Sequence, residues 1–117
     1  ARRRMIESIF ATGLPFGGRP DLPETLQDLS RLLPACAGVR RWGAAALDLA
    51  YVAGGRYEGF WERRLNPWDV AAGVLIVREA GGLVEPLRPG GDILEDGEVI
   101  CANAEIFDQF AKTIRGD

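Results

Sequence analysis

Residues 66–82 read NPWDVAAGVLIVREAGG, and they predict a buried helix that carries an acid near its start. The Asn-Pro pair at the beginning supplies a common N-cap residue, followed by a residue that suits the first helical position. Val70, Val74 and Val77 recur at the spacing of one helical face, and the apolar residues between them widen that face. A helix with such a wide apolar surface is expected to be buried on most sides. The Gly-Gly pair at its end is typical of a helix stop.

Asp69 falls at the third position of this predicted helix, where a negative charge is favourable against the helix dipole. Local sequence leaves two interpretations open. The carboxylate either neutralises the free N–H groups of the first turn, where acids are common, or it binds a ligand.

The same stretch resembles the second signature of the inositol monophosphatase family, the lithium-sensitive, magnesium-dependent phosphatases of sugar and inositol phosphates. The matching features are the tryptophan directly before Asp69, the small residues one turn later, and the Glu-Ala-Gly-Gly ending. The run LDLAYVA at residues 47–53 is most similar to bacterial members of the extragenic-suppressor type. The resemblance implies that Asp69 is a catalytic residue that binds Mg²⁺ and also touches the substrate hydroxyl. Oxygen ligands are those that magnesium prefers.

The resemblance implies further substrate contacts at Gly43, Ala44, Ala45 and Glu62. The first three match a step that opens a helix in the family, where free N–H groups form a cradle for hydroxyl or phosphate oxygens. Ala44 replaces the hydroxyl residue usual in the family, so only its backbone N–H remains to contact the substrate. The alternative interpretation of these three small residues is that they allow close packing of the helix. Glu62 lies seven residues before Asp69 and matches a glutamate that hydrogen-bonds a sugar or cyclitol hydroxyl. Its alternative is an exposed acid at a strand end.

One carboxylate cannot assemble the two-metal site of the family. The other family ligands are a glutamate in a G-E-E/D-type element and two aspartates in a D-P-[LI]-D-G-[ST] element, and this sequence contains neither. Asp92, Glu95 and Asp96 lack the proline-framed pattern and are interpreted as turn residues. We therefore expect residues 1–117 to form a single C-terminal α/β subdomain of a sugar or inositol phosphatase. We expect that the N-terminal metal-binding half lies outside this sequence and that this piece is inactive alone.

Segments with strand and helix periodicity alternate along the chain. Strands are predicted at 6–13, 38–42, 57–62, 83–87 and 98–102, and helices at 22–33, 43–53, 67–80 and 105–114. The leucines at 22, 26, 29 and 33 are expected to form the buried face of the first helix. This alternation predicts an α/β fold with a mixed, mostly parallel sheet flanked by helices. The resemblance specifies the C-terminal half of the layered α-β-α-β-α fold of the inositol phosphatases.

Composition excludes several classes of protein. A chain of 117 residues with 47% hydrophobic content can form one small domain with a core. The net charge of −3 provides no basic field, which disfavours nucleic acid as a partner. No apolar run reaches the roughly 20 residues of a membrane span. Cys36 and Cys101 are interpreted as small core residues, which favours a reducing, cytoplasmic setting. The absence of histidine excludes His-based triads in this chain.

Three hypotheses of function follow. The first is magnesium-dependent hydrolysis of a small phosphate monoester by a homodimer, with inositol monophosphate as the default substrate. Other sugar or nucleotide phosphates, such as fructose bisphosphate, are alternative substrates. The second is a non-catalytic protein-interaction role in transcription regulation, which the resemblance to bacterial members suggests. The third is a standalone module without an active site, in which Glu62 and Asp69 would point apart or into the core.

Overall fold

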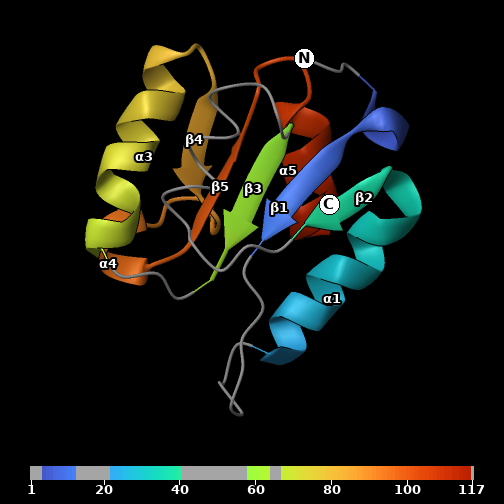
Figure 1. The fold of residues 1–117 in the computed structure, drawn as a ribbon. Helices are drawn as coiled ribbons and strands as arrows, with labels where there is room; N and C mark the ends of the chain where they lie inside the picture. The colour runs from blue at the N-terminus through green and yellow to red at the C-terminus, as the bar shows by residue number, and fades with distance from the viewer. Residues whose placement is uncertain (1–3, 13–21, 41–57, 64–66, 117) are drawn as a thin grey trace.

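The computed structural model describes residues 4–12, 22–40, 58–63 and 67–116, which build a five-stranded sheet with helices on both faces (Figure 1). The strands are β1 (Ile9–Thr12), β2 (Gly38–Arg40), β3 (Gly59–Glu62), β4 (Leu83–Pro86) and β5 (Val99–Ala102). The helices are α1 (Leu22–Leu32), α3 (Pro67–Glu79), α4 (Ile93–Asp96) and α5 (Phe107–Arg115), with 3₁₀ turns η1 (Met5–Glu7) and η2 (Leu33–Ala35). None of the helices in these ranges is long and apolar enough to cross a membrane.

The strand order is β2-β1-β3-β5-β4. Strand β1 pairs in parallel with both β2 and β3, whereas β5 pairs antiparallel with both β3 and β4. It follows that β5 runs against a common direction shared by the other four strands. The prediction of a mixed, mostly parallel α/β sheet is therefore confirmed.

The sheet separates two apolar clusters, because successive side chains of a strand point to opposite faces. One cluster packs beneath α1 and α5 and includes Phe10, Trp61 and Phe110. Phe110 stacks on Phe10 with ring centroids 4.2 Å apart and meets the edge of Trp61 at 6.0 Å. The other cluster packs beneath α3 and includes Val77 and Cys101. Strand β5 is buried along its whole length, as its apolar sequence predicts.

Helix α1 corrects part of one prediction, because Leu29 packs against the core as expected, whereas Leu26 and, in the following η2 turn, Leu33 do not. Leu26 and Leu33 are 54% and 53% exposed, whereas Thr25, Asp28 and Leu32 are buried. The reason is a tertiary contact, since Asp28 accepts hydrogen bonds from side chains of residues that follow it by more than 30 positions. A buried carboxylate with matched donors turns the helix about its axis and leaves two leucines outside.

Helix α3 corrects a second prediction, because it is buried on one side rather than on most sides. Val74 and Val77 pack against the sheet, as the valine spacing predicts. Leu75 and Ile76 stay 58% and 46% exposed. These two side chains give the outer side of α3 an apolar surface.

Two predicted boundaries shift, and one short helix is added, for local reasons. The first strand is shorter than 6–13, because Ser8 Oγ donates to the Arg4 carbonyl at 2.7 Å and closes the η1 turn before it. The region 88–97 contains α4, whose first turn is capped by Asp92 Oδ1, 3.1 Å from the backbone N of Glu95. The last helix extends to Arg115, and Gly116 ends it in the left-handed region with φ 80°.

Both cysteines are free thiols in the core, as predicted. Burial raises the pKa of Cys101 to about 12, outweighing a backbone hydrogen bond to Phe60, and burial also raises the pKa of Cys36.

The raised pKa of Cys101 predicts a loss of stability at alkaline pH. The thiol of an unfolded cysteine has a pKa of about 8.5. The stability that the neutral Cys101 thiol contributes to the folded state is therefore fully present below that pH and is lost as the pH rises toward the folded pKa. The expected slope from this thiol is about 1.4 kcal/mol per pH unit above pH 8.5. Urea unfolding between pH 8 and 10.5 measures it, and Cys101→Ala should flatten the slope by this amount. An identical slope in the variant would contradict the assignment.

Candidate functional site at the carboxyl edge of the sheet

The carboxyl ends of β1, β2 and β3 lie at one edge of the sheet, because these strands are mutually parallel. Thr12, Arg40 and Glu62 are the last residues of the three strands. Helix α3 begins at Pro67, shortly after β3 ends, and Figure 1 shows its first turn at the end of the sheet toward which β1 and β3 point. Ligands of open α/β sheets characteristically bind outside the carboxyl ends of the strands. This edge is therefore the candidate site.

The structure describes Glu62 fully, Asp69 by its backbone only, and the other predicted site residues not at all. Glu62 is the partly exposed last residue of β3, it is paired with Val99 of β5, and it is not free of interactions. Asp69 is the third residue of α3, as predicted, and its side chain lies outside the described part of the structure. Gly43, Ala44 and Ala45 also lie outside the described residues. The structure thus brings Glu62 and the start of α3 to the same edge of the sheet.

A charged cluster beside Glu62 was not predicted from the sequence. Asp28 of α1, 1% exposed, accepts a hydrogen bond from Trp61 Nε1 at 3.1 Å. It also forms a bidentate pair with Arg63, through Nε to Oδ2 at 2.9 Å and Nη2 to Oδ1 at 3.1 Å. The available signal was the spacing of Thr25, Asp28 and Leu32 on one helical face, but the leucine stripe was the stronger pattern.

Further charges surround the guanidinium of Arg63. Its Nη1 lies 3.1 Å from Glu24 Oε2 and 3.5 Å from Glu98 Oε2. Arg88 Nε lies 3.1 Å from Glu98 Oε1, but the angle does not make a hydrogen bond, so this contact is an ion pair only. Burial lowers the pKa of Arg63, but the hydrogen bond and charge of Asp28 and the charges of Glu98 and Glu24 outweigh it and raise the pKa overall. Arg63 is therefore a permanent cation in the cluster.

The strand end is also held from the side of β1. Thr12 Oγ1 donates to the Trp61 carbonyl oxygen at 2.7 Å, and both residues are buried. The backbone immediately before Glu62 therefore has a fixed partner in addition to the sheet ladder.

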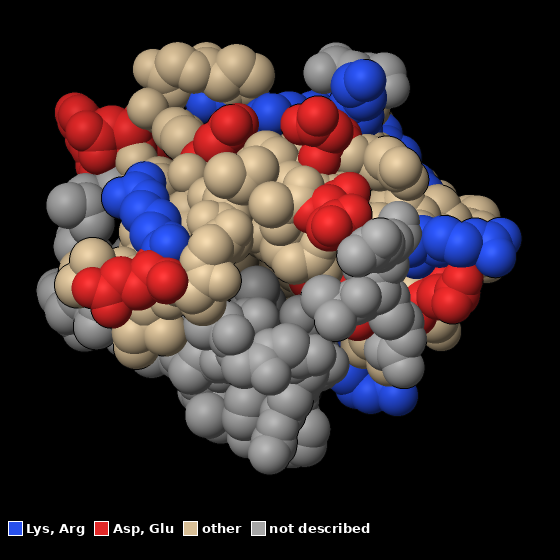
Figure 2. Space-filling view, turned by 90° about the horizontal axis from the view of Figure 1, so that it is seen from above, with Lys and Arg blue, Asp and Glu red and all other residues tan. Residues whose placement is uncertain are grey.

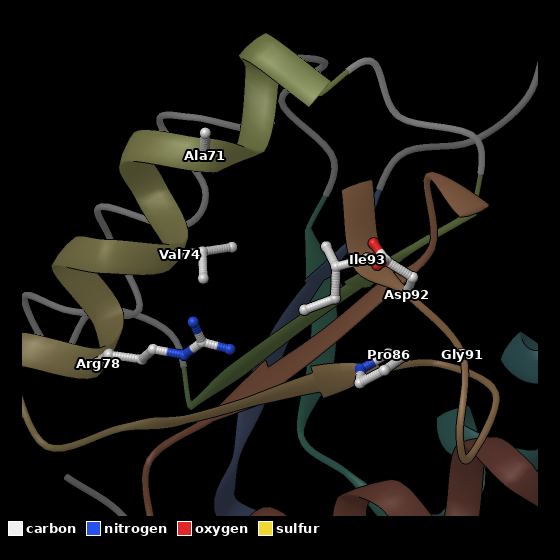
Figure 3. Close-up of a pocket in the computed structure, with 7 residues that line it drawn as sticks. All are labelled: Ala71, Val74, Arg78, Pro86, Gly91, Asp92 and Ile93. Atoms are coloured by element: carbon white, nitrogen blue, oxygen red, sulfur yellow. The ribbon is translucent and has the colours of Figure 1, made fainter. Parts of the chain in front are cut away.

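A pocket of about 420 Å³ lies between α3 and the segment from β4 to α4 (Figure 3). Arg78 and Asp92 are its charged lining residues, among apolar ones that include Val74 and Ile93. Two acids of this segment serve its local structure, because Asp92 caps α4 and Asp96 Oδ2 accepts from the backbone N of Asp92 at 3.1 Å. Glu95 and Asp96 lie in α4 itself, which corrects their interpretation as turn residues. On the face seen in Figure 2, acidic and basic side chains of the described residues are interspersed, without a field of one sign.

A mixed sheet between helical layers, with a glutamate and a helix start at its carboxyl edge, defines an α/β unit with a candidate ligand-binding edge. The model of the inositol monophosphatase family matches residues 5–116. This chain belongs to the inositol monophosphatase family.

Similar proteins agree with this assignment. An inositol-1-monophosphatase from Caulobacter vibrioides is 44% identical, over 98% of this chain and 45% of its own length. The Nus factor SuhB of Pseudomonas aeruginosa is 42% identical, over 97% of this chain and 43% of its own length. The crystal structure of the extragenic suppressor protein suhB from Bartonella henselae matches with a TM-score of 0.91 at 43% identity, covering 98% of this chain and 44% of that one. The chain spans a little under half the length of these relatives.

Proposed function

We propose that this chain is the C-terminal subdomain of a phosphoric monoester hydrolase, with inositol monophosphate as its substrate. The observation that carries the proposal is the family match over residues 5–116, on a fold that brings Glu62 and the first turn of α3 to one sheet edge. The name of the Caulobacter vibrioides relative, an inositol-1-monophosphatase, supports the choice of substrate.

The proposed roles follow from residue chemistry. Asp69 would hold Mg²⁺, because carboxylate oxygens suit this ion. Glu62 would accept a hydrogen bond from a substrate hydroxyl, and the backbone N–H groups of Gly43, Ala44 and Ala45 would donate to substrate oxygens. When bound, the ion would supply charge stabilisation to the reacting phosphate.

The remaining metal ligands are proposed to belong to an N-terminal half of the protein, outside residues 1–117. The coverage of the relatives supports this, because the Caulobacter vibrioides protein is matched over 45% of its own length. Among the residues that the structure describes, no three His, Cys, Asp or Glu side chains form a group that could hold a metal ion. We further propose a lithium-sensitive, cytoplasmic homodimer.

A second candidate is a protein-interaction role in transcription regulation that does not need catalysis. It is supported by the name of the Pseudomonas aeruginosa relative, a Nus factor. Such a role should survive Asp69→Asn, because it would use a protein surface rather than the metal.

The test is phosphate release from inositol monophosphate with Mg²⁺, with and without lithium, by the full-length protein and by residues 1–117 alone. We expect lithium-sensitive release by the full-length protein and none by the isolated chain, with circular dichroism to establish that the isolated chain is folded. Release by the isolated chain would contradict the divided site. A full-length protein that hydrolyses neither inositol monophosphate nor other sugar and nucleotide phosphates would contradict the phosphatase proposal.

A further inference from the structure

The two residues that flank Glu62 are both bound by one buried carboxylate. Asp28 receives the indole N–H of Trp61 and two N–H groups of Arg63, at 2.9–3.1 Å. Glu62 lies between these two residues in the chain. One side chain of α1 therefore tethers the end of β3 on both sides of the proposed substrate contact.

The geometry of this tether is directional. A bidentate guanidinium–carboxylate pair defines an orientation as well as a distance, which a single ion pair does not. Glu98 adds a contact to Arg63 from the residue before β5, and the exposed Glu24 adds one from the start of α1. Arg63 is thus held by two acids of α1, Asp28 and Glu24, and by Glu98, which is distant from them in sequence.

A strand end needs such support if it carries a substrate contact. Productive geometries are held to within about 0.5 Å, and residues at element ends do this only when neighbouring contacts restrain them. Thr12 restrains the carbonyl of Trp61 at 2.7 Å, and Asp28 restrains the side chains on both sides of Glu62. Together these contacts leave the backbone at Glu62 little freedom to rotate.

We propose that Asp28 is a positioning residue for substrate binding, which orients Glu62 toward the substrate hydroxyl through Trp61 and Arg63. This inference rests on the proposed role of Glu62. The competing interpretation is that Asp28 only anchors α1 to the sheet. The two differ in a measurable way, because a positioning residue acts through Glu62 and an anchor does not.

The experiment is a double-mutant cycle in the full-length protein with Asp28→Asn and Glu62→Gln, alone and combined. Asparagine keeps the size of the side chain but loses the charge and the bidentate pairing with Arg63. We expect each single variant to raise KM for inositol monophosphate about 10-fold, with kcat changed less, because each weakens one hydrogen bond to the substrate. The combined variant should be no worse than Glu62→Gln alone.

Para-nitrophenyl phosphate, which has no ring hydroxyl for Glu62, provides a second readout. Its KM should not change in any of the three variants. A matched control is Glu85→Gln, which breaks the exposed pair between Glu85 and Arg115 at 3.1 Å on another strand and should leave KM unchanged for both esters. If Asp28→Asn does not fold, Arg63→Lys replaces it, because lysine keeps the charge but cannot form the bidentate pair.

The possible outcomes separate the hypotheses. Two results would overturn the positioning role of Asp28 while leaving the function of Glu62 intact. One is a combined variant whose increase in KM is the product of the two single increases. The other is an Asp28→Asn variant in which KM rises equally for inositol monophosphate and para-nitrophenyl phosphate. An unchanged KM in Glu62→Gln would instead overturn the proposed role of Glu62 and this inference with it. A full-length protein without phosphatase activity would overturn both as well.

Discussion

Asp69→Asn in the full-length protein is expected to lower kcat for phosphate release by about 10²-fold or more, with the fold intact. The amide is as large as the carboxylate but carries no charge for Mg²⁺. A metal ligand contributes several kcal/mol of charge stabilisation, and each 1.36 kcal/mol corresponds to a factor of ten in rate. Steady-state kinetics with inositol monophosphate over a range of Mg²⁺ concentrations measures the effect.

The control for Asp69→Asn must separate loss of a ligand from loss of a favourable charge at a helix start. Asp108 is an exposed acid in the first turn of α5, so Asp108→Asn removes a comparable charge away from the proposed site. Both substitutions should cost a few tenths to about 1 kcal/mol of stability, but only the first should affect turnover. Near-normal kcat in Asp69→Asn would remove this residue from the mechanism and favour the helix-cap interpretation.

Gly59→Ala is expected to destabilise the protein by about 3 kcal/mol. A Cβ at this position of β3 would lie 2.8 Å from the Cys101 carbonyl oxygen, 2.8 Å from Phe110 Cε2 and 2.9 Å from Phe10 Cδ1. Two stacked rings and a neighbouring strand would have to move, and a packed interior resists such shifts. Urea unfolding measures the loss as a lower midpoint at constant slope.

Gly38→Ala is the matched control, because Gly38 lies in β2 and a Cβ there would meet Arg40 Nη1 at an ordinary 3.5 Å. Its free energy of unfolding should stay within about 0.5 kcal/mol of the wild type. Similar losses in the two variants would contradict the assignment of the effect to the tight space at Gly59.

Where apolar periodicity and tertiary packing agree, elements could be predicted from the sequence. The apolar run that became β5 and the spacing of Ile106, Phe110 and Ile114 led to correct elements, with all three of these side chains buried. The helix from Pro67 was placed to within one residue of its observed end at Glu79. In these segments each local preference points to the same structure as the global fold.

The candidate site could be predicted only in part. The signature around Asp69 and the spacing to Glu62 are local patterns, and they indicated the family that the comparisons then confirmed. The contacts of Asp28 with the two neighbours of Glu62 could not be predicted from such local patterns. Asp28 and Arg63 are 35 positions apart, and no short sequence motif predicts their bidentate pair.

The amino-acid sequence was sufficient for the alternation of strands and helices, the mixed sheet and the family, because periodicity and signature motifs are encoded in neighbouring residues. The orientation of α1, the exposed outer side of α3 and the tight space at Gly59 required the three-dimensional structure. Each depends on which distant groups meet. A helix turned to bury Leu26 would carry Asp28 away from the indole of Trp61 and from Arg63, and a buried donor without a partner is costly.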